Sequence, residues 1–168
     1  MAQRRYIARF EHSAERVYRA FTSREYWDAK MEEFRKLTPQ SEIDSLVINA
    51  TGIGVTLTQV LPRTELPTIA QTVMKKDMVI TRQEFFAPFD PDRTKGCYAA
   101  SIPSGPGSLQ GWIELVAQGT SCYLERVTEV TVDIPLINSK IENLILENLD
   151  DLFGGEDEFT TAWLAENA

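Results

Sequence analysis

The hydrophobic period of the chain changes at Pro135. The preceding stretch, SCYLERVTEVTVDI (121–134), places apolar residues at every second position, which is typical of a strand with one buried face. From Ile137 to Leu152 the apolar residues recur every three or four positions, which is typical of an amphipathic helix. Proline cannot donate to a β-ladder, so the strand ends there. The sequence therefore predicts a long strand that leads directly into a long helix over 137–152.

One strand and two short helices are predicted at the start of the chain. RRYIARFEH (4–12) alternates and predicts the first strand. Ser13 can cap a helix over 14–23, and Ser23 can cap a second helix over 24–34. A serine hydroxyl in this position accepts a hydrogen bond from the free N–H groups of the first helical turn.

The middle of the chain consists of alternating segments separated by turn residues. These segments predict strands over 43–51, 54–61, 77–87, 94–102, 109–117 and 121–134, with a short helical turn at 68–76. Consecutive strands joined by short turns form antiparallel meanders. We therefore expect an α+β fold in one domain over 1–168, with a seven-stranded antiparallel sheet and a long C-terminal helix.

The inner face of the last strand follows from its alternation. The more apolar face holds Cys122, Leu124, Arg126, Thr128, Val130, Val132 and Ile134. Folding the hairpins about their turns places Leu115 opposite Cys122 and Cys97 opposite Leu115, and it also turns Ile113 inward. The two cysteines are then separated by one strand, or roughly 9–10 Å, which is too far for a disulfide. The register predicts two free, buried thiols. In the strand 78–87, either Glu84 or Phe85 faces inward.

The long helix carries an asparagine in its apolar stripe. At about 100° per residue, the stripe holds Ile137, Ile141, Leu144, Ile145 and Leu152, with Asn148 near its middle. Asn148 either bonds water or backbone at an exposed end of the helix, or it is a polar anchor in an apolar cavity. Phe159 and Trp163 keep the same phase, so the helix either continues to about 166 or kinks at Gly154 and Gly155.

Arg126 is the one charged residue on the predicted inner face of the last strand. One interpretation is structural: an internal ion pair, with Glu84 as a candidate partner, or a strand-end residue that reaches solvent. The other is functional. A guanidinium group can clamp the carboxylate or phosphate of a ligand with two parallel hydrogen bonds.

Composition excludes several classes of partner. The formal net charge of −8 argues against a nucleic-acid partner and against an anionic membrane surface. No segment is apolar enough for a membrane span, and the basic N-terminus lacks the apolar core of a secretory signal. Two cysteines without CxxC spacing and one histidine provide no metal motif, and no cofactor is expected. We expect a cytoplasmic protein with reduced thiols.

Three stretches resemble a known superfamily: SAERVYRAFTSREYW (13–27), TEVTVDIPLINSKIENLI (128–145) and FTTAWLAE (159–166). They are similar to the opening, the strand-to-helix passage and the final turns of START-like, or SRPBCC, proteins. This superfamily has the helix-grip fold of polyketide cyclases, pollen-allergen-like lipid binders and START domains. Within it, the chain looks closest to a bacterial branch of unassigned function. The resemblance covers nearly the whole chain, and it implies a sheet wrapped around the C-terminal helix with a hydrophobic cavity between them.

Three hypotheses about function follow. The first is a noncatalytic binder of a hydrophobic small molecule or lipid. Its expected ligand-binding residues are Ile113, Leu115, Arg126, Thr128, Ile141, Leu144 and Asn148. The second is a polyketide cyclase-like or dehydratase-like enzyme, for which Glu84 and Arg126 are the candidate groups. The third is an interaction protein, with a homodimer as one assembly, whose core is filled by its own side chains. Its outer patch would hold Tyr98, Ile102, Trp112 and Tyr123.

Overall fold

The computed structural model describes residues 1–72, 74–102 and 105–167. Its elements in chain order are β1 (Ala2–Phe10), α1 (Ala14–Phe21), α2 (Arg24–Arg35), β2 (Glu42–Asn49), β3 (Gly52–Leu61), the 3₁₀ turn η1 (Arg63–Glu65), α3 (Thr68–Gln71), β4 (Met78–Phe86), β5 (Arg93–Ser101), β6 (Gly107–Gln118), β7 (Ser121–Val132) and α4 (Asn138–Glu166). The predicted helical turn at 68–76 corresponds to α3, and its position 73 lies outside the described residues.

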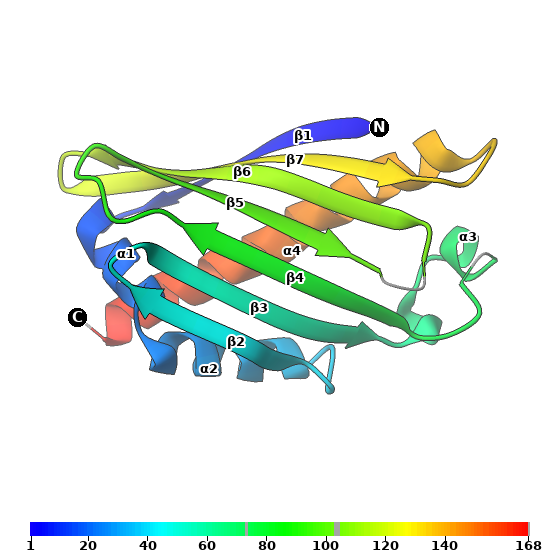
Figure 1. Ribbon diagram of the computed structural model, residues 1–168, viewed down its shortest axis with the longest axis horizontal. Coiled ribbons are helices and arrows are strands. Elements are labelled where there is room, and N and C mark those ends of the chain that lie inside the picture. Colours follow the sequence, from blue (N-terminus) through cyan, green and yellow to red (C-terminus); the bar gives the residue numbers. More distant parts are fainter. Residues whose placement is uncertain (73, 103–104, 168) are drawn as a thin grey trace.

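The strands form one antiparallel sheet in the order β1-β7-β6-β5-β4-β3-β2. The sheet curves across α4, which runs along its inner side (Figure 1). The helices α1 and α2 lie near the C-terminal end of α4, and α3 lies at the opposite end of the molecule (Figure 1). The predicted α+β helix-grip fold, with two short helices after the first strand, is confirmed.

Serine caps start both short helices, as predicted. The Ser13 hydroxyl accepts a hydrogen bond of 3.2 Å from the Arg16 amide, and the Ser23 hydroxyl accepts one of 3.4 Å from the Tyr26 amide. Each hydroxyl satisfies a backbone donor that has no partner within its helix. The second helix then buries Tyr26, Trp27 and Met31 against the core.

The predicted faces of β6 and β7 are correct, although their register is shifted. Leu115 lies opposite Leu124, not opposite Cys122. A shift of two residues leaves every side chain on its predicted face. Leu115, Cys122, Leu124 and Thr128 are accordingly buried.

The predicted face of β5 is wrong. Cys97 lies opposite Trp112, not opposite Leu115, so Cys97 is exposed and Tyr98 turns into the core. The reason is packing at Gly111, the direct neighbour of Tyr98 on β6. A Cβ atom at Gly111 would lie 2.6 Å from the Tyr98 ring, so only glycine leaves room for this aromatic side chain. Burying a tyrosine ring there removes far more apolar surface from water than burying a cysteine would.

The long helix continues without interruption through Gly154 and Gly155 to Glu166. Its buried side is rotated from the predicted stripe and holds Ile141, Glu142, Leu146, Leu149, Phe153, Glu156, Thr160 and Leu164. Of the predicted stripe, Ile141 is buried, Leu144 and Ile145 are half-buried, and Asn148 and Leu152 are exposed. Buried side chains on both sides of the glycines keep the helix continuous despite its low local propensity for helix.

Thiol reactivity tests the reversed face of β5. We expect one thiol to react quickly with an aromatic disulfide reagent in the native protein and the other only after unfolding. Burial raises the pKa of Cys122 from 9.0 to about 11, which keeps that thiol protonated and slow to react. Cys97→Ser should remove the fast phase, whereas loss of the fast phase in Cys122→Ser would contradict the assignment.

A pair of glycine substitutions tests the packing at Tyr98. Gly111→Ala should destabilise the protein by about 1–3 kcal/mol in urea unfolding, because the new methyl group meets the Tyr98 ring and the Val127 carbonyl oxygen. Gly154→Ala is the control, since a Cβ atom there meets nothing within 4 Å. It should stabilise the protein by roughly 0.5–1 kcal/mol through helix propensity. Equal effects of the two substitutions would remove the steric argument.

Candidate functional site

A cavity of about 300 Å³ lies between the inner face of the sheet and the N-terminal half of α4. Its lining includes residues of α3, which lies at one end of the molecule in Figure 1. Its walls come from β3 to β7, from the η1–α3 segment and from α4. The volume is at the lower end of the usual range for small-molecule sites, roughly 300–1,000 Å³.

Most of the cavity wall is apolar. The η1–α3 segment contributes Leu66, Pro67 and Ala70, and α4 contributes Ile141, Leu144, Ile145 and Leu149. The strands add Ile80, Ala100, Leu109 and Val130. Leu152 also lines the cavity and is 39 % exposed, so the wall reaches the surface along α4.

A few polar side chains interrupt this wall. Gln59, Arg82 and Tyr98 are buried, and Asn148 is exposed. The Tyr98 hydroxyl is hydrogen-bonded to the hydroxyl of Thr128, which is fully buried behind it. Burial raises the pKa of Tyr98 well above its usual range, so the phenol stays protonated. The cavity therefore combines a large apolar surface with a small polar wall at its buried side.

The predicted ligand-binding residues fall into two groups. Ile141, Leu144 and Asn148 line the cavity together. Ile113 and Leu115 belong to the packed core, and Thr128 lies behind Tyr98. Arg126 is not among the cavity-lining residues.

Arg126 makes an ion pair, but not with the predicted partner. Its two terminal nitrogens lie 3.0 and 3.2 Å from the carboxylate oxygens of Asp157 on α4. Its guanidinium carbon lies 4.6 Å from the centre of the Phe153 ring, a distance typical of a cation–π contact. Glu84 does face inward, as one alternative predicted, but its partner is Arg82, at 2.7 Å.

Sequence reasoning missed a buried ion cluster that joins α2, β4, β7 and α4. The Glu156 carboxylate on α4 lies 3.1 Å from the Lys30 ammonium on α2 and 3.2 Å from a terminal nitrogen of Arg82 on β4. With Glu84, Arg126 and Asp157, these residues form what we call the ion cluster. Their side chains are between 2 % and 20 % exposed. Arg82 belongs both to the cluster and to the cavity wall.

Partners in the ion cluster outweigh the cost of burial. Burial alone would raise the pKa of Glu156, but Arg82 and Lys30 lower it from 4.5 to about 2. Burial would likewise lower the pKa of Arg82, but Glu156 and Glu84 raise it above its ordinary value. Glu156, Arg82 and Lys30 are therefore all charged at neutral pH.

The sequence did hold a signal for this cluster. Lys30 sits on the same face of its helix as Tyr26 and Trp27, both of which are core residues. Arg82 and Glu84 share the inner face of β4. A lysine inside an apolar stripe indicates a buried carboxylate partner, because buried charges are almost always paired.

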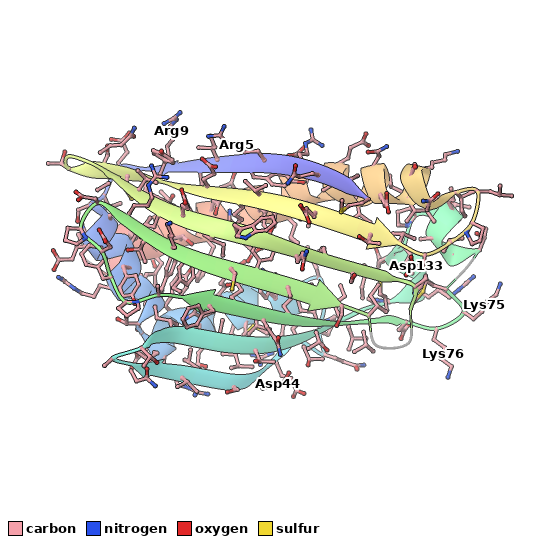
Figure 2. The ribbon with its side chains drawn as sticks, turned by 45° about the horizontal axis from the view of Figure 1, so that its top comes forward. Arg5, Arg9, Asp44, Lys75, Lys76 and Asp133 are labelled. Atoms are coloured by element: carbon pink, nitrogen blue, oxygen red, sulfur yellow. The ribbon has the colours of Figure 1, made fainter. Side chains whose placement is uncertain are left out.

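The outer face of the sheet carries a separate apolar patch. Val47, Phe85 and Trp112 are exposed there and line a groove together with Cys97. Trp112 is outward as predicted, whereas Tyr98 is not. Charged side chains surround the sheet: Figure 2 shows Arg5 and Arg9 beside β1, Asp44 beside β2, and Lys75, Lys76 and Asp133 at the end where α3 lies.

The described residues contain neither a metal-binding group of side chains nor a membrane-spanning helix. Within 1–72, 74–102 and 105–167, no three or more His, Cys, Asp or Glu side chains are grouped so as to hold a metal ion. Across the same ranges, no helix is both long and apolar enough to cross a membrane.

The sheet, the helix that it grips and the cavity between them define a helix-grip protein with an internal pocket. The chain belongs to the family described as "Protein of unknown function (DUF2505)", whose model matches residues 5–164. An uncharacterized protein of Mycobacterium tuberculosis is 28% identical in an alignment 172 positions long, which covers 95% of this chain and 95% of that protein.

Solved structures share the fold at low sequence identity. A protein from Thermus thermophilus superposes with a TM-score of 0.63 at 16% identity, covering 99% of this chain and 100% of that one. Norcoclaurine synthase from Thalictrum flavum, determined in complex with dopamine and hydroxybenzaldehyde, has a TM-score of 0.53 at 16% identity, covering 99% and 88%. At these identities the likeness establishes the fold alone.

The pH dependence of stability tests the role of Glu156. A depressed carboxyl pKa adds stability that is present above the unfolded value and is lost as the pH falls. For Glu156 that loss lies between pH 4.5 and about 2. Glu156→Gln should remove this part of the pH dependence in urea unfolding, and it should cost about 3–5 kcal/mol at neutral pH because Lys30 and Arg82 lose their shared partner. Glu158→Gln, at an exposed position of the same helix, should leave stability within about 0.5 kcal/mol.

Proposed function

We propose that this protein binds an apolar small molecule in the cavity between the sheet and α4. The observation that carries the proposal is the wall of this cavity, in which aliphatic side chains from α3, α4 and five strands face a space of about 300 Å³. Removing a ligand's apolar surface from water there would contribute roughly 0.8 kcal/mol for each buried methylene group.

The fold supports this proposal. One structural neighbour, norcoclaurine synthase, was determined with two small molecules, dopamine and hydroxybenzaldehyde. The helix-grip fold is therefore compatible with small-molecule binding. Leu152 lines the cavity and is partly exposed, so the cavity wall reaches solvent along α4.

The contacts favour binding over acid–base catalysis. Glu84 and Arg126 are the groups that the cyclase-like hypothesis requires. Glu84 is paired with Arg82 at 2.7 Å, and Arg126 is paired with Asp157 at 3.0 Å. Neither is among the described residues that line the cavity. A general acid or base must reach its substrate within hydrogen-bond distance, and these two groups are held elsewhere.

Filling the cavity tests the proposed function. The neutral fluorophore phenylnaphthylamine should bind the wild-type protein at micromolar concentration with enhanced emission, and decanol should displace it. Ala100→Trp should reduce this binding by more than about tenfold, because Ala100 lines the cavity on β5 and an indole would occupy much of the space. The measurement is a fluorescence titration of each folded variant.

The chain offers a matched control on the same strand. Ala99 is exposed on the opposite face of β5, so Ala99→Trp adds the same side chain outside the cavity. This variant should bind the fluorophore as the wild type does. Equal loss of binding in both variants, or no binding by the wild type, would overturn the proposed function.

A further inference from the structure

The polar wall of the cavity is part of a charge-balanced cluster. Arg82 contacts the cavity, and its guanidinium lies 2.7 Å from Glu84 and 3.2 Å from Glu156. Lys30 shares Glu156 at 3.1 Å, and Arg126 is paired with Asp157 at 3.0 Å. The cluster thus holds three cations and three carboxylates, so its formal charge is zero. The positive charge of Arg82 is already balanced by these carboxylates.

A ligand carboxylate in this cavity would be a fourth anion beside three cations. It would have to leave water for a space lined mainly by aliphatic side chains, where Arg82 is already paired with Glu84 and Glu156. Burying a charge without its own counter-charge is strongly unfavourable. The clamp for an acidic ligand that the sequence allowed at Arg126 is therefore replaced by a wall that disfavours anions.

The same wall is suited to a neutral polar group. The Gln59 side-chain oxygen accepts a hydrogen bond of 3.4 Å from Arg82, which points its amide nitrogen away from the guanidinium as a donor. Asn148 also lines the cavity and is solvent-accessible. Among the described residues, no side-chain hydrogen bond uses the Gln59 amide nitrogen or the Asn148 side chain. These amides can serve a hydroxyl, carbonyl or amide group of a ligand without any change in charge.

We infer that the ligand is an uncharged amphiphile: an aliphatic body with a neutral hydrogen-bonding head, such as an alcohol, ketone or amide, and not a fatty acid or a phosphate ester. The head lies against Gln59 and Arg82 at the buried side of the cavity, and the apolar body lies along α4 and the η1–α3 segment. This inference rests on the proposed function and specifies the ligand class for the same cavity.

Three ligands with the same chain length test it. Decanol, decanamide and decanoate are titrated against phenylnaphthylamine bound to the wild-type protein at about pH 8, where the acid is fully ionised. Decanol and decanamide should displace the probe at concentrations about tenfold or more below that of decanoate, because only decanoate adds an unbalanced charge. Glu84→Gln gives the cluster one net positive charge, so it should reduce this difference by roughly tenfold.

Glu125→Gln is the matched control. It removes the same charge from β7, where Glu125 faces outward and pairs with Arg5 at 2.7 Å, and Figure 2 shows Arg5 at that edge of the sheet. This variant should keep the wild-type order of affinities. The affinity of the probe for each variant shows that its cavity is intact.

The outcomes separate the two proposals. If the probe binds but decanoate displaces it as well as decanol does, or if none of the three compounds displaces it, the neutral-head inference is wrong and the proposed function stands. If Glu84→Gln and Glu125→Gln change the ratio equally, the charge-balance argument is wrong. If the probe does not bind the wild type at all, the proposed function fails, and the inference fails with it.

Discussion

The buried carboxylate of Glu156 is the interaction on which the arrangement of the helices depends. It joins α4 to Lys30 on α2 and to Arg82 on β4, and these elements are far apart in the sequence. Charge-assisted hydrogen bonds add directional specificity to the apolar packing of the helix. The neighbouring pair of Arg126 and Asp157 anchors the next residue of α4 to β7. Together these contacts fix the phase and position of α4, and the cavity beside its N-terminal half takes its shape from that placement.

The fold was predictable from the sequence because the alternation of the last strand and the helical period after Pro135 each hold over many residues. The change of period at Pro135 located the last strand and the long helix, and the serine caps located α1 and α2. The face of β5 was wrong because it was taken from the hairpin turn with β6: Cys97 pairs with Trp112 and not with Leu115, and this odd shift of three residues reverses the face. Its orientation depends on a tertiary contact between Tyr98 and Gly111, which no local pattern contains. The phase of α4 was misjudged for a similar reason: Glu142 and Glu156 are polar by type but buried in fact.

The candidate site was predictable only in part. Ile141, Leu144 and Asn148 line the cavity because α4 must present one side to the sheet, and the helical period identified that region. Arg82 and Gln59 were not recognised, because a charged residue in a strand is usually solvated and its burial depends on partners contributed by α2 and α4. The same long-range pairing decides that Arg126 belongs to the structure and not to the cavity.

Charge balance in the ion cluster also determines how the molecule responds to ionic strength. Since the cluster sums to zero, the formal net charge of −8 resides entirely outside it. At 0.1 M salt, interactions between exposed charges more than about 10 Å apart are largely screened, whereas buried pairs are screened much less. Added salt therefore reduces the mutual repulsion of the acidic surface and leaves the contacts that hold α4 almost unchanged. Moderate salt should therefore favour the folded state, because it weakens the surface repulsion and leaves the buried ion pairs intact.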